Sequence, residues 1–170
     1  MAVPAALADP IPGFDFDPVK LTQRMDQCTS RQVDDGFLLM GGINVSSGEK
    51  RQCRCSSLKH MLEDPRPGGE QHDPYSDPEG FMRCADRTVS YGFPRPASGP
   101  GNKQNILQFR GTEQRAHVVY NEATGDIATI YTEPAQDNWH DCAYWAPGAA
   151  VRPGPAPEVA RSGVAVLAGR

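Results

Sequence analysis

The chain has 170 residues, of which 38% are hydrophobic and 8% aromatic, and a formal net charge of −4. This length fits one domain with tails, and no stretch approaches the ~18–20 apolar residues that a membrane helix needs, so we expect a soluble chain without a membrane partner. The acidic balance argues against tight nucleic-acid binding through phosphates, although a local basic patch would still allow it. The 16 Pro and 17 Gly predict many loops and few long helices.

The first half of the chain predicts an arm followed by a meander. Residues 1–20 carry four prolines and are expected to form an extended arm, while residues 18–27 fit either a short helix or the approach to a strand. Residues 28–55 are predicted to form a hairpin or meander. Its strand-like stretches are 28–33, 37–47 and 49–55, separated by turns at 34–36 and 47–48.

Residues 56–63 form the strongest helical pattern in the chain. Ser56 or Ser57 can cap this helix, and Pro65 ends it. The stretches 64–79 and 94–104 are predicted to be loops, and residues 80–93 between them contain the strand-like segments FMRCA and TVSYGF. Residues 147–170 are predicted to form a disordered tail. The main domain is therefore expected at 21–146.

Residues 105–142 predict three antiparallel strands and a closing cysteine. Gly125 at the hairpin turn sets a register in which His117 lies opposite Tyr131 and Val119 opposite Thr129. One face of this sheet is apolar enough to pack against a helix, for which we propose 56–63. The other face is polar and carries Gln108, Arg110, His117, Thr129 and Tyr131. The expected fold class is α+β, with one short helix on a twisted antiparallel sheet and long Pro/Gly loops.

Four segments, in order, carry a resemblance to a known family: SYGF at 90–93, ILQFR at 106–110, RAHVVYNEATGDIATIYT at 115–132 and DNWHDC at 137–142. They resemble the fungal guanyl-specific ribonucleases and their ribotoxin relatives. That family has a Leu-Leu-Glu-Phe-Pro strand, an Arg-Val-Val-Phe-Asn-Glu-type strand, an Ile-x-His-Thr strand and a terminal Asn-Phe-x-x-Cys. The resemblance covers about a third of the chain and implies a microbial ribonuclease-like fold.

The resemblance also implies a catalytic site, and this chain departs from it at every catalytic position. The family uses a Glu helped by a His as base, a second His as acid and an Arg for the phosphate charge. The corresponding residues here are Gln108, Phe93, Tyr131 and His117. Glutamine is no useful base, and an unperturbed tyrosine has a pKa of about 10. The remaining candidates for ligand contacts are Tyr91, Arg110, Arg115, Trp139 and His140.

The five cysteines indicate either disulfides or a metal. Zinc would use Cys53, Cys55, His60 and His72 or Cys84, but this spacing contains no CxxC, so we expect no metal and no cofactor. Disulfides would indicate an oxidising compartment and leave one thiol unpaired. The resemblance implies the pair Cys28–Cys142, and Cys84 would then bind Cys53 or Cys55.

These features lead to a secreted ribonuclease-like effector of a fungal pathogen, a monomeric pseudoenzyme acting in virulence by binding a host protein or RNA. One alternative is an active secreted endoribonuclease of the ribotoxin type, with Arg110 and Arg115 as cations, His117 as base and His140 or His72 as acid. Another alternative is a bacterial ribonuclease-like toxin domain with reduced cysteines.

Overall fold

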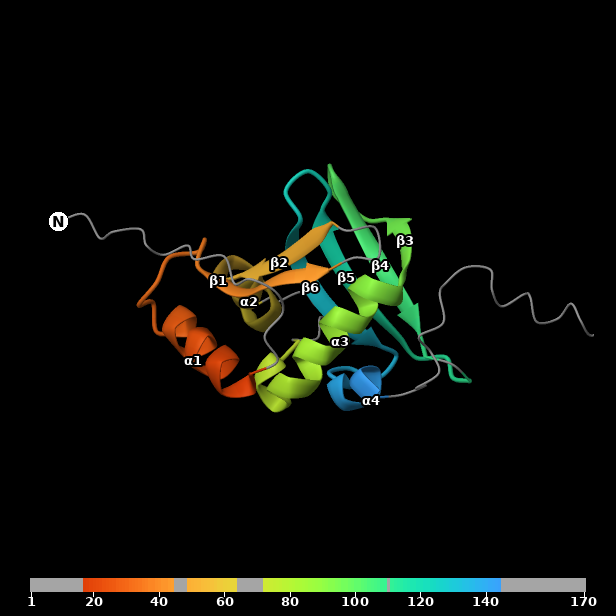
Figure 1. Cartoon of the computed structure of the whole chain (residues 1–170), viewed down its shortest axis with the longest axis horizontal. Coiled ribbons are helices and arrows are strands. Elements are labelled where there is room, and N and C mark those ends of the chain that lie inside the picture. The colour runs from red at the N-terminus through yellow and green to blue at the C-terminus, as the bar shows by residue number, and fades with distance from the viewer. Residues whose placement is uncertain (1–16, 45–48, 64–71, 110, 145–170) are drawn as a thin grey trace, which may run out of the picture.

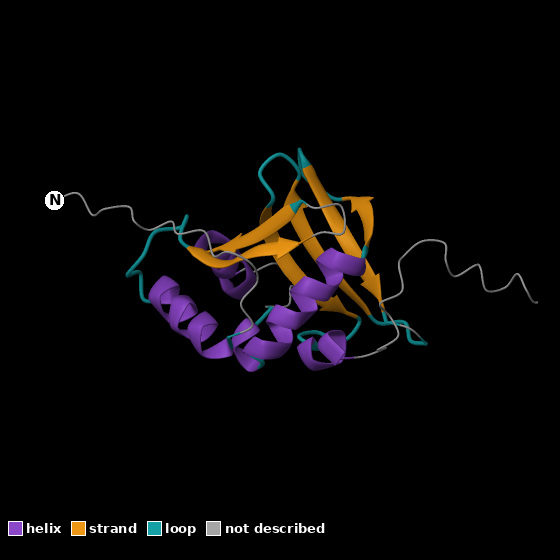
Figure 2. Ribbon diagram, viewed as in Figure 1, coloured by secondary structure: helices purple, strands orange, loops and turns teal. Residues whose placement is uncertain are grey.

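The computed structural model describes residues 17–44, 49–63, 72–109 and 111–144. These residues form an α+β fold, as predicted, in which helices pack against one six-stranded sheet (Figures 1 and 2). The helices are α1 (Pro18–Thr29), α2 (Cys55–Glu63), α3 (Pro78–Tyr91) and α4 (Trp139–Tyr144), with a 3-10 turn, η2, at Pro74–Ser76. The strands are β1 (Leu38–Asn44), β2 (Lys50–Arg54), β3 (Phe93–Pro96), β4 (Asn102–Gln108), β5 (Arg115–Asn121) and β6 (Asp126–Glu133).

The strands predicted within 105–142 are confirmed as β4, β5 and β6, and the predicted register is observed up to Val119, after which a bulge shifts it so that Tyr120 pairs with Ile127. His117 pairs with Tyr131 and Val119 with Thr129. The turn needs glycine, because Gly125 adopts a φ of 80° while its N–H donates to the Asn121 carbonyl. The sheet order is β1-β2-β6-β5-β4-β3, and β2 pairs with β6 in parallel. The prediction of a purely antiparallel sheet is therefore wrong, because the long connection from β2 to β6 brings them together in the same direction.

The N-terminal part of the described chain is helical, which confirms the helix alternative for residues 18–27. Pro18 occupies the first turn of α1, where a proline costs no hydrogen bond, and the Asp17 side chain accepts from the Val19 and Lys20 N–H groups. The strand predicted at 28–33 is wrong, because α1 continues to Thr29. The helix crosses the expected domain boundary at residue 20. The remainder of the arm, residues 1–16, lies outside the described residues, as does the expected tail at 147–170.

The two strands predicted within 80–93 are wrong, because residues 78–91 form a single helix, α3. Asp77 caps it by accepting from the Gly80 N–H. Phe81, Ala85 and Thr88 are buried at helical spacing, and this periodicity outweighs the strand propensity of the aromatic and β-branched residues. Figure 1 shows α3 lying across the sheet, where it contacts β1, β4 and β5.

The helix predicted at 56–63 is confirmed as α2, but it is not the main helix on the sheet. It follows β2 directly and packs against β6, β2 and α1. The predicted loop at 64–79 is described only from residue 72, where it contains η2 and the start of α3. The predicted loop at 94–104 is shorter than expected, because β3 extends into it from one side and β4 from the other.

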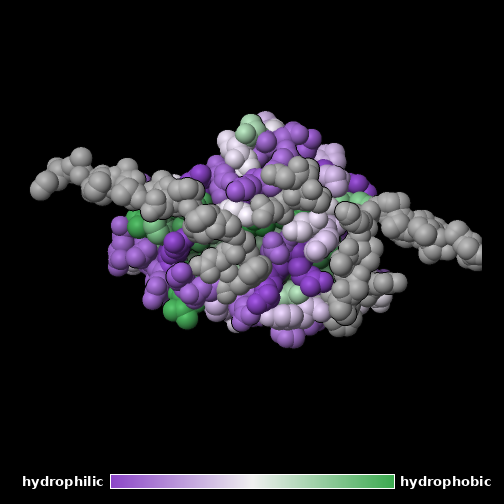
Figure 3. Space-filling view, in the orientation of Figure 1, coloured by the Kyte–Doolittle hydropathy of each residue, from purple (hydrophilic) through white to green (hydrophobic). Residues whose placement is uncertain are grey.

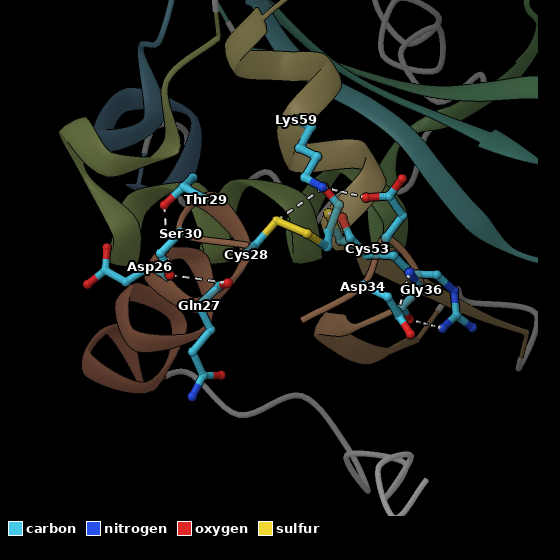
Figure 4. Close-up of a disulfide and its surroundings, with 12 residues drawn as sticks. Asp26, Gln27, Cys28, Thr29, Ser30, Asp34, Gly36, Cys53 and Lys59 are labelled. Carbon is cyan, nitrogen blue, oxygen red and sulfur yellow. Dashed lines mark hydrogen bonds and ion pairs between the residues drawn. A yellow bond between two sulfur atoms is a disulfide. The ribbon is translucent and has the colours of Figure 1, made fainter. Parts of the chain in front are cut away.

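Two disulfides form, but neither joins the predicted partners. Cys28 of α1 bonds to Cys55 of α2, and Cys84 of α3 bonds to Cys142 of α4. The predicted pair Cys28–Cys142 and the assignment of Cys84 to Cys53 or Cys55 are wrong. Because β2 ends at Arg54 and α2 begins at Cys55, Cys55 faces α1, whereas Cys53 stays in the core as a free thiol (Figure 4). Burial raises the pKa of the Cys53 thiol to about 12, so it remains protonated.

The helical side of the molecule presents a mixed surface. Figure 3 shows hydrophilic side chains over most of the visible part of this side, with hydrophobic side chains in small separate spots. Within the ranges given above, no helix combines the length and hydropathy required to cross a membrane.

Candidate functional site

The register of the sheet brings the predicted site positions onto one face. Phe93 pairs with Ile106, Ile106 with His117, and His117 with Tyr131, so these four side chains form one row across β3 to β6. Paired residues of neighbouring strands project to the same side of a sheet. The opposite side carries the buried Ala116, Val118 and Ile130 and forms the core.

A second row on the same face lies beside the first. It contains Gln108, Arg115 and Glu133, because Gln108 pairs with Arg115 and Arg115 with Glu133. We refer to these two rows together as the polar face. It includes all four positions that the resemblance assigns to catalysis: Phe93, Gln108, His117 and Tyr131. Arg110, also predicted on this face, lies outside the described residues.

His117 is the central side chain of the polar face, and protein atoms enclose it. Its side chain is only 7% exposed. Its Nε2 lies 2.9 Å from Glu133 Oε1 and its Nδ1 lies 3.0 Å from Gln104 Oε1. The Gln104 amide nitrogen donates to the Pro96 carbonyl, which holds the Gln104 oxygen toward the imidazole. His117 therefore has no ring nitrogen available to exchange a proton with a substrate unless one of these contacts breaks.

Aromatic stacking closes the polar face further. The rings of His117 and Tyr131 stack with centroids 4.5 Å apart and an angle of 4° between their planes. His72, from the segment before η2, stacks with Tyr131 at 5.3 Å. The His72 Nδ1 lies 3.9 Å from the Asp137 carboxylate, whose pKa is raised above its ordinary value by burial. Tyr131 thus has two ring neighbours from the protein itself.

Glu133 is the functional residue that sequence reasoning missed. Its Oε1 lies 3.1 Å from the Arg115 guanidinium as well as 2.9 Å from His117. The register available from the sequence contained the signal: if His117 lies opposite Tyr131, then Arg115 lies opposite Glu133 on the same face. Glu133 thus places a carboxylate on the polar face.

An open hollow of about 500 Å³ adjoins Glu133 at one end of the polar face. Its lining residues are Gln108, Thr112, Glu113, Arg115, Glu133 and Pro134. The Gln108 amide nitrogen donates to the Thr112 carbonyl at 2.6 Å and to the Gln114 carbonyl at 3.3 Å. Gln108 therefore organises the loop that borders the hollow.

Three residues predicted to contact a ligand lie away from the polar face. Trp139 is fully buried, packs edge-on against Phe81 at 5.0 Å and donates its Nε1–H to the Asp73 carbonyl. Trp139 was predicted to contact a ligand, but its side chain packs in the core. His140 lies on α4, beside Tyr144, and Tyr91 is the last residue of α3. Arg115 is the predicted contact that the structure does place on the polar face.

The enclosure of His117 predicts a pH-dependent stability. Burial lowers the pKa of His117 below its ordinary 6.5, although hydrogen bonding to Glu133 opposes the shift. As the pH falls through 6.5 the unfolded chain binds a proton that the folded chain does not yet bind, so this contribution to stability is lost in acid. We expect urea unfolding of His117→Gln to show a smaller stability loss between about pH 7.5 and about pH 5 than the wild type.

His140→Gln is the matched control, because that histidine side chain is 74% exposed. It should leave the pH dependence of the wild type unchanged. If the His117→Gln protein lost as much stability in acid as the wild type, the pH dependence would have to come from other groups.

On the polar face the Glu133 carboxylate contacts both the Arg115 guanidinium and the His117 imidazole. Among the described residues, no group of three or more His, Cys, Asp or Glu side chains is placed to hold a metal ion. Comparisons of the chain with protein-family models, with curated proteins and with solved structures found no match.

Proposed function

We propose that the chain is a secreted ribonuclease-like protein that does not cleave RNA and binds a protein partner through its polar face. The ordered resemblance of four segments to the fungal ribonucleases supports this relationship. The packing of α3 on the antiparallel strands β3 to β6 is compatible with the fold that the resemblance implies. The two disulfides favour an oxidising compartment and weigh against the bacterial toxin with reduced cysteines.

The observation that carries the proposal is the enclosure of His117. It is the only histidine at the four positions that the resemblance assigns to catalysis, and both its ring nitrogens contact protein oxygens. A general acid or base must reach the proton that it transfers. Gln108, Phe93 and Tyr131 offer no replacement that titrates near neutrality. The four positions that the resemblance assigns to catalysis thus hold no group that is free to exchange protons with RNA.

The charges on the polar face favour a protein partner over RNA. The Arg115 guanidinium, which would be the obvious phosphate contact, already pairs with Glu133. The chain as a whole carries a formal charge of −4. RNA binding draws much of its affinity from cations that neutralise phosphates, and this face offers little of that. Tyrosine, phenylalanine and arginine, which this face carries, are enriched at protein interfaces.

An RNA cleavage assay on the purified, oxidised protein tests this function. We expect no cleavage of single-stranded RNA above a buffer blank, and no change when His117 is replaced by Ala. A fungal guanyl-specific ribonuclease serves as positive control. Cleavage that disappears in the His117→Ala variant would overturn the non-catalytic proposal.

One observation favours a second candidate, an active endoribonuclease with rearranged residues. Glu133 contacts both His117 and Arg115, so a carboxylate helped by an imidazole lies beside a cation. In this candidate Glu133, whose side chain is 39% exposed, would be the base. Its signature would be cleavage by the wild type that falls by about 10²-fold or more in Glu133→Gln, the range expected when a general base is lost.

A further inference from the structure

We infer that the hollow beside Glu133 binds a cationic side chain, arginine or lysine, from the protein partner. This inference rests on the proposed function, because it names the chemistry by which the polar face would recognise that partner. The hollow is lined by Gln108, Thr112, Glu113, Arg115, Glu133 and Pro134. Its volume of about 500 Å³ lies within the range of sites that enclose small ligands and is ample for one long side chain.

Apart from the Arg115 guanidinium, which pairs with Glu133, the lining of the hollow offers hydrogen-bond acceptors. Among the described residues, the Gln108 amide group makes two hydrogen bonds, and in both its nitrogen donates, to the Thr112 and Gln114 carbonyls. These bonds fix the amide so that its carbonyl oxygen is left to accept from a ligand. Glu113 and Glu133 add carboxylate oxygens. A ligand that donates several hydrogen bonds, such as a guanidinium or an ammonium group, matches this lining.

The charge of the hollow points to the same ligand. The lining includes two residues with carboxylates, Glu113 and Glu133, and one with a guanidinium, Arg115. The formal charge of the lining residues that the structure describes is therefore −1, and the Arg115 charge is partly used in the pair with Glu133 at 3.1 Å. The net charge of −4 for the whole chain adds a weak, longer-range attraction for a basic partner.

An anionic ligand such as a phosphate would require the opposite charge in the hollow. It would need the Arg115 guanidinium free of Glu133, and it would bring a further negative charge close to two carboxylates. The two ligand classes therefore predict effects of opposite sign when the charges of the hollow are changed one at a time. This contrast allows the inference to be tested before the partner is known.

The test uses Nα-acetyl-arginine amide as the probe, titrated into the ¹⁵N-labelled full chain and followed by amide chemical shifts. The neutral isostere Nα-acetyl-citrulline amide and inorganic phosphate are titrated in parallel. We expect the arginine probe to shift residues around 108–115 and 133 and to bind more tightly than the citrulline probe. Glu113→Gln should weaken the arginine probe by about two- to fivefold, as expected for one solvent-accessible ion pair.

Arg115→Gln should strengthen binding of the arginine probe by a similar factor of about two to five, because Glu133 loses its competing partner. The control Glu122→Gln removes the same charge from a carboxylate that pairs with Lys103 elsewhere on the sheet, and it should leave the affinity unchanged. Equal binding of the arginine and citrulline probes, or an equal effect of Glu122→Gln and Glu113→Gln, would overturn the inference. Phosphate binding at the hollow that Arg115→Gln abolishes would overturn it in favour of an anion site.

Failure of this inference can be distinguished from failure of the proposed function. The RNA cleavage assay depends on His117 and Glu133, whereas probe binding depends on Glu113 and on the difference between arginine and citrulline. A protein that leaves RNA intact and ignores the arginine probe would keep the non-catalytic proposal and lose only the cationic ligand. The urea midpoint of each variant establishes that it is folded before its titration is interpreted.

Discussion

Replacing Cys84 and Cys142 together by Ala is expected to lower the free energy of unfolding by about 4 kcal/mol. These cysteines are 58 residues apart in the sequence and join α3 to α4. In the chain-entropy model, the cross-link stabilises the fold because it removes freedom from the unfolded chain, and the effect grows with the length of the closed loop. This bond also holds α4 and the end of β6 against the helix that covers the core.

Urea unfolding of the oxidised wild type and of the double variant measures this loss. The Cys28/Cys55→Ala pair is the matched comparison, with a separation of 27 residues and an expected loss of about 3.5 kcal/mol. A thiol assay under denaturing, non-reducing conditions should find one reactive group in the wild type, that of Cys53. Five reactive thiols, or a loss below about 1 kcal/mol in the double variant, would contradict the assigned disulfide framework.

Replacing Trp139 by Ala is expected to cost about 3–5 kcal/mol of stability, the usual range for removing a buried aromatic side chain. Trp139 is fully buried, contacts Phe81 edge-to-face and donates a hydrogen bond to the Asp73 carbonyl. The variant would leave a cavity between α3 and α4 and would leave the Asp73 carbonyl without this donor. Thermal or urea unfolding measures the effect.

Trp139→Phe keeps most of the ring volume but not the hydrogen bond, so its loss should be clearly smaller. His140→Ala, at the neighbouring position of α4, should change stability by no more than about 0.5 kcal/mol, because its side chain is 74% exposed. A Trp139→Ala protein of unchanged stability that fails to bind the partner would restore the ligand-contact role predicted from the resemblance.

The sequence was sufficient to predict the central strands and their register. Alternating side chains and the glycine at position 125 determine β5, β6 and the pairing of His117 with Tyr131. The same register, extended by two pairs, would have placed Glu133 beside Arg115. Helix α2 could also be predicted, because its cap, its apolar stripe and its terminating proline lie within one short segment.

Only the tertiary structure could reveal α3, the disulfides and the closure of the site. Residues 80–93 are rich in strand-forming side chains, and their helix is stabilised by burying Phe81, Ala85 and Thr88 in the interior, where Phe81 packs against Trp139 of α4. Disulfide partners depend on which cysteines meet in space, and the start of α2 at Cys55 decided that Cys55, not Cys53, meets Cys28. A sequence shows that a histidine is present at a site position, but whether it can exchange a proton depends on contacts made by distant segments. For His117 those contacts come from Gln104, Tyr131 and Glu133, which are separated from it in the sequence and meet it only in the folded sheet.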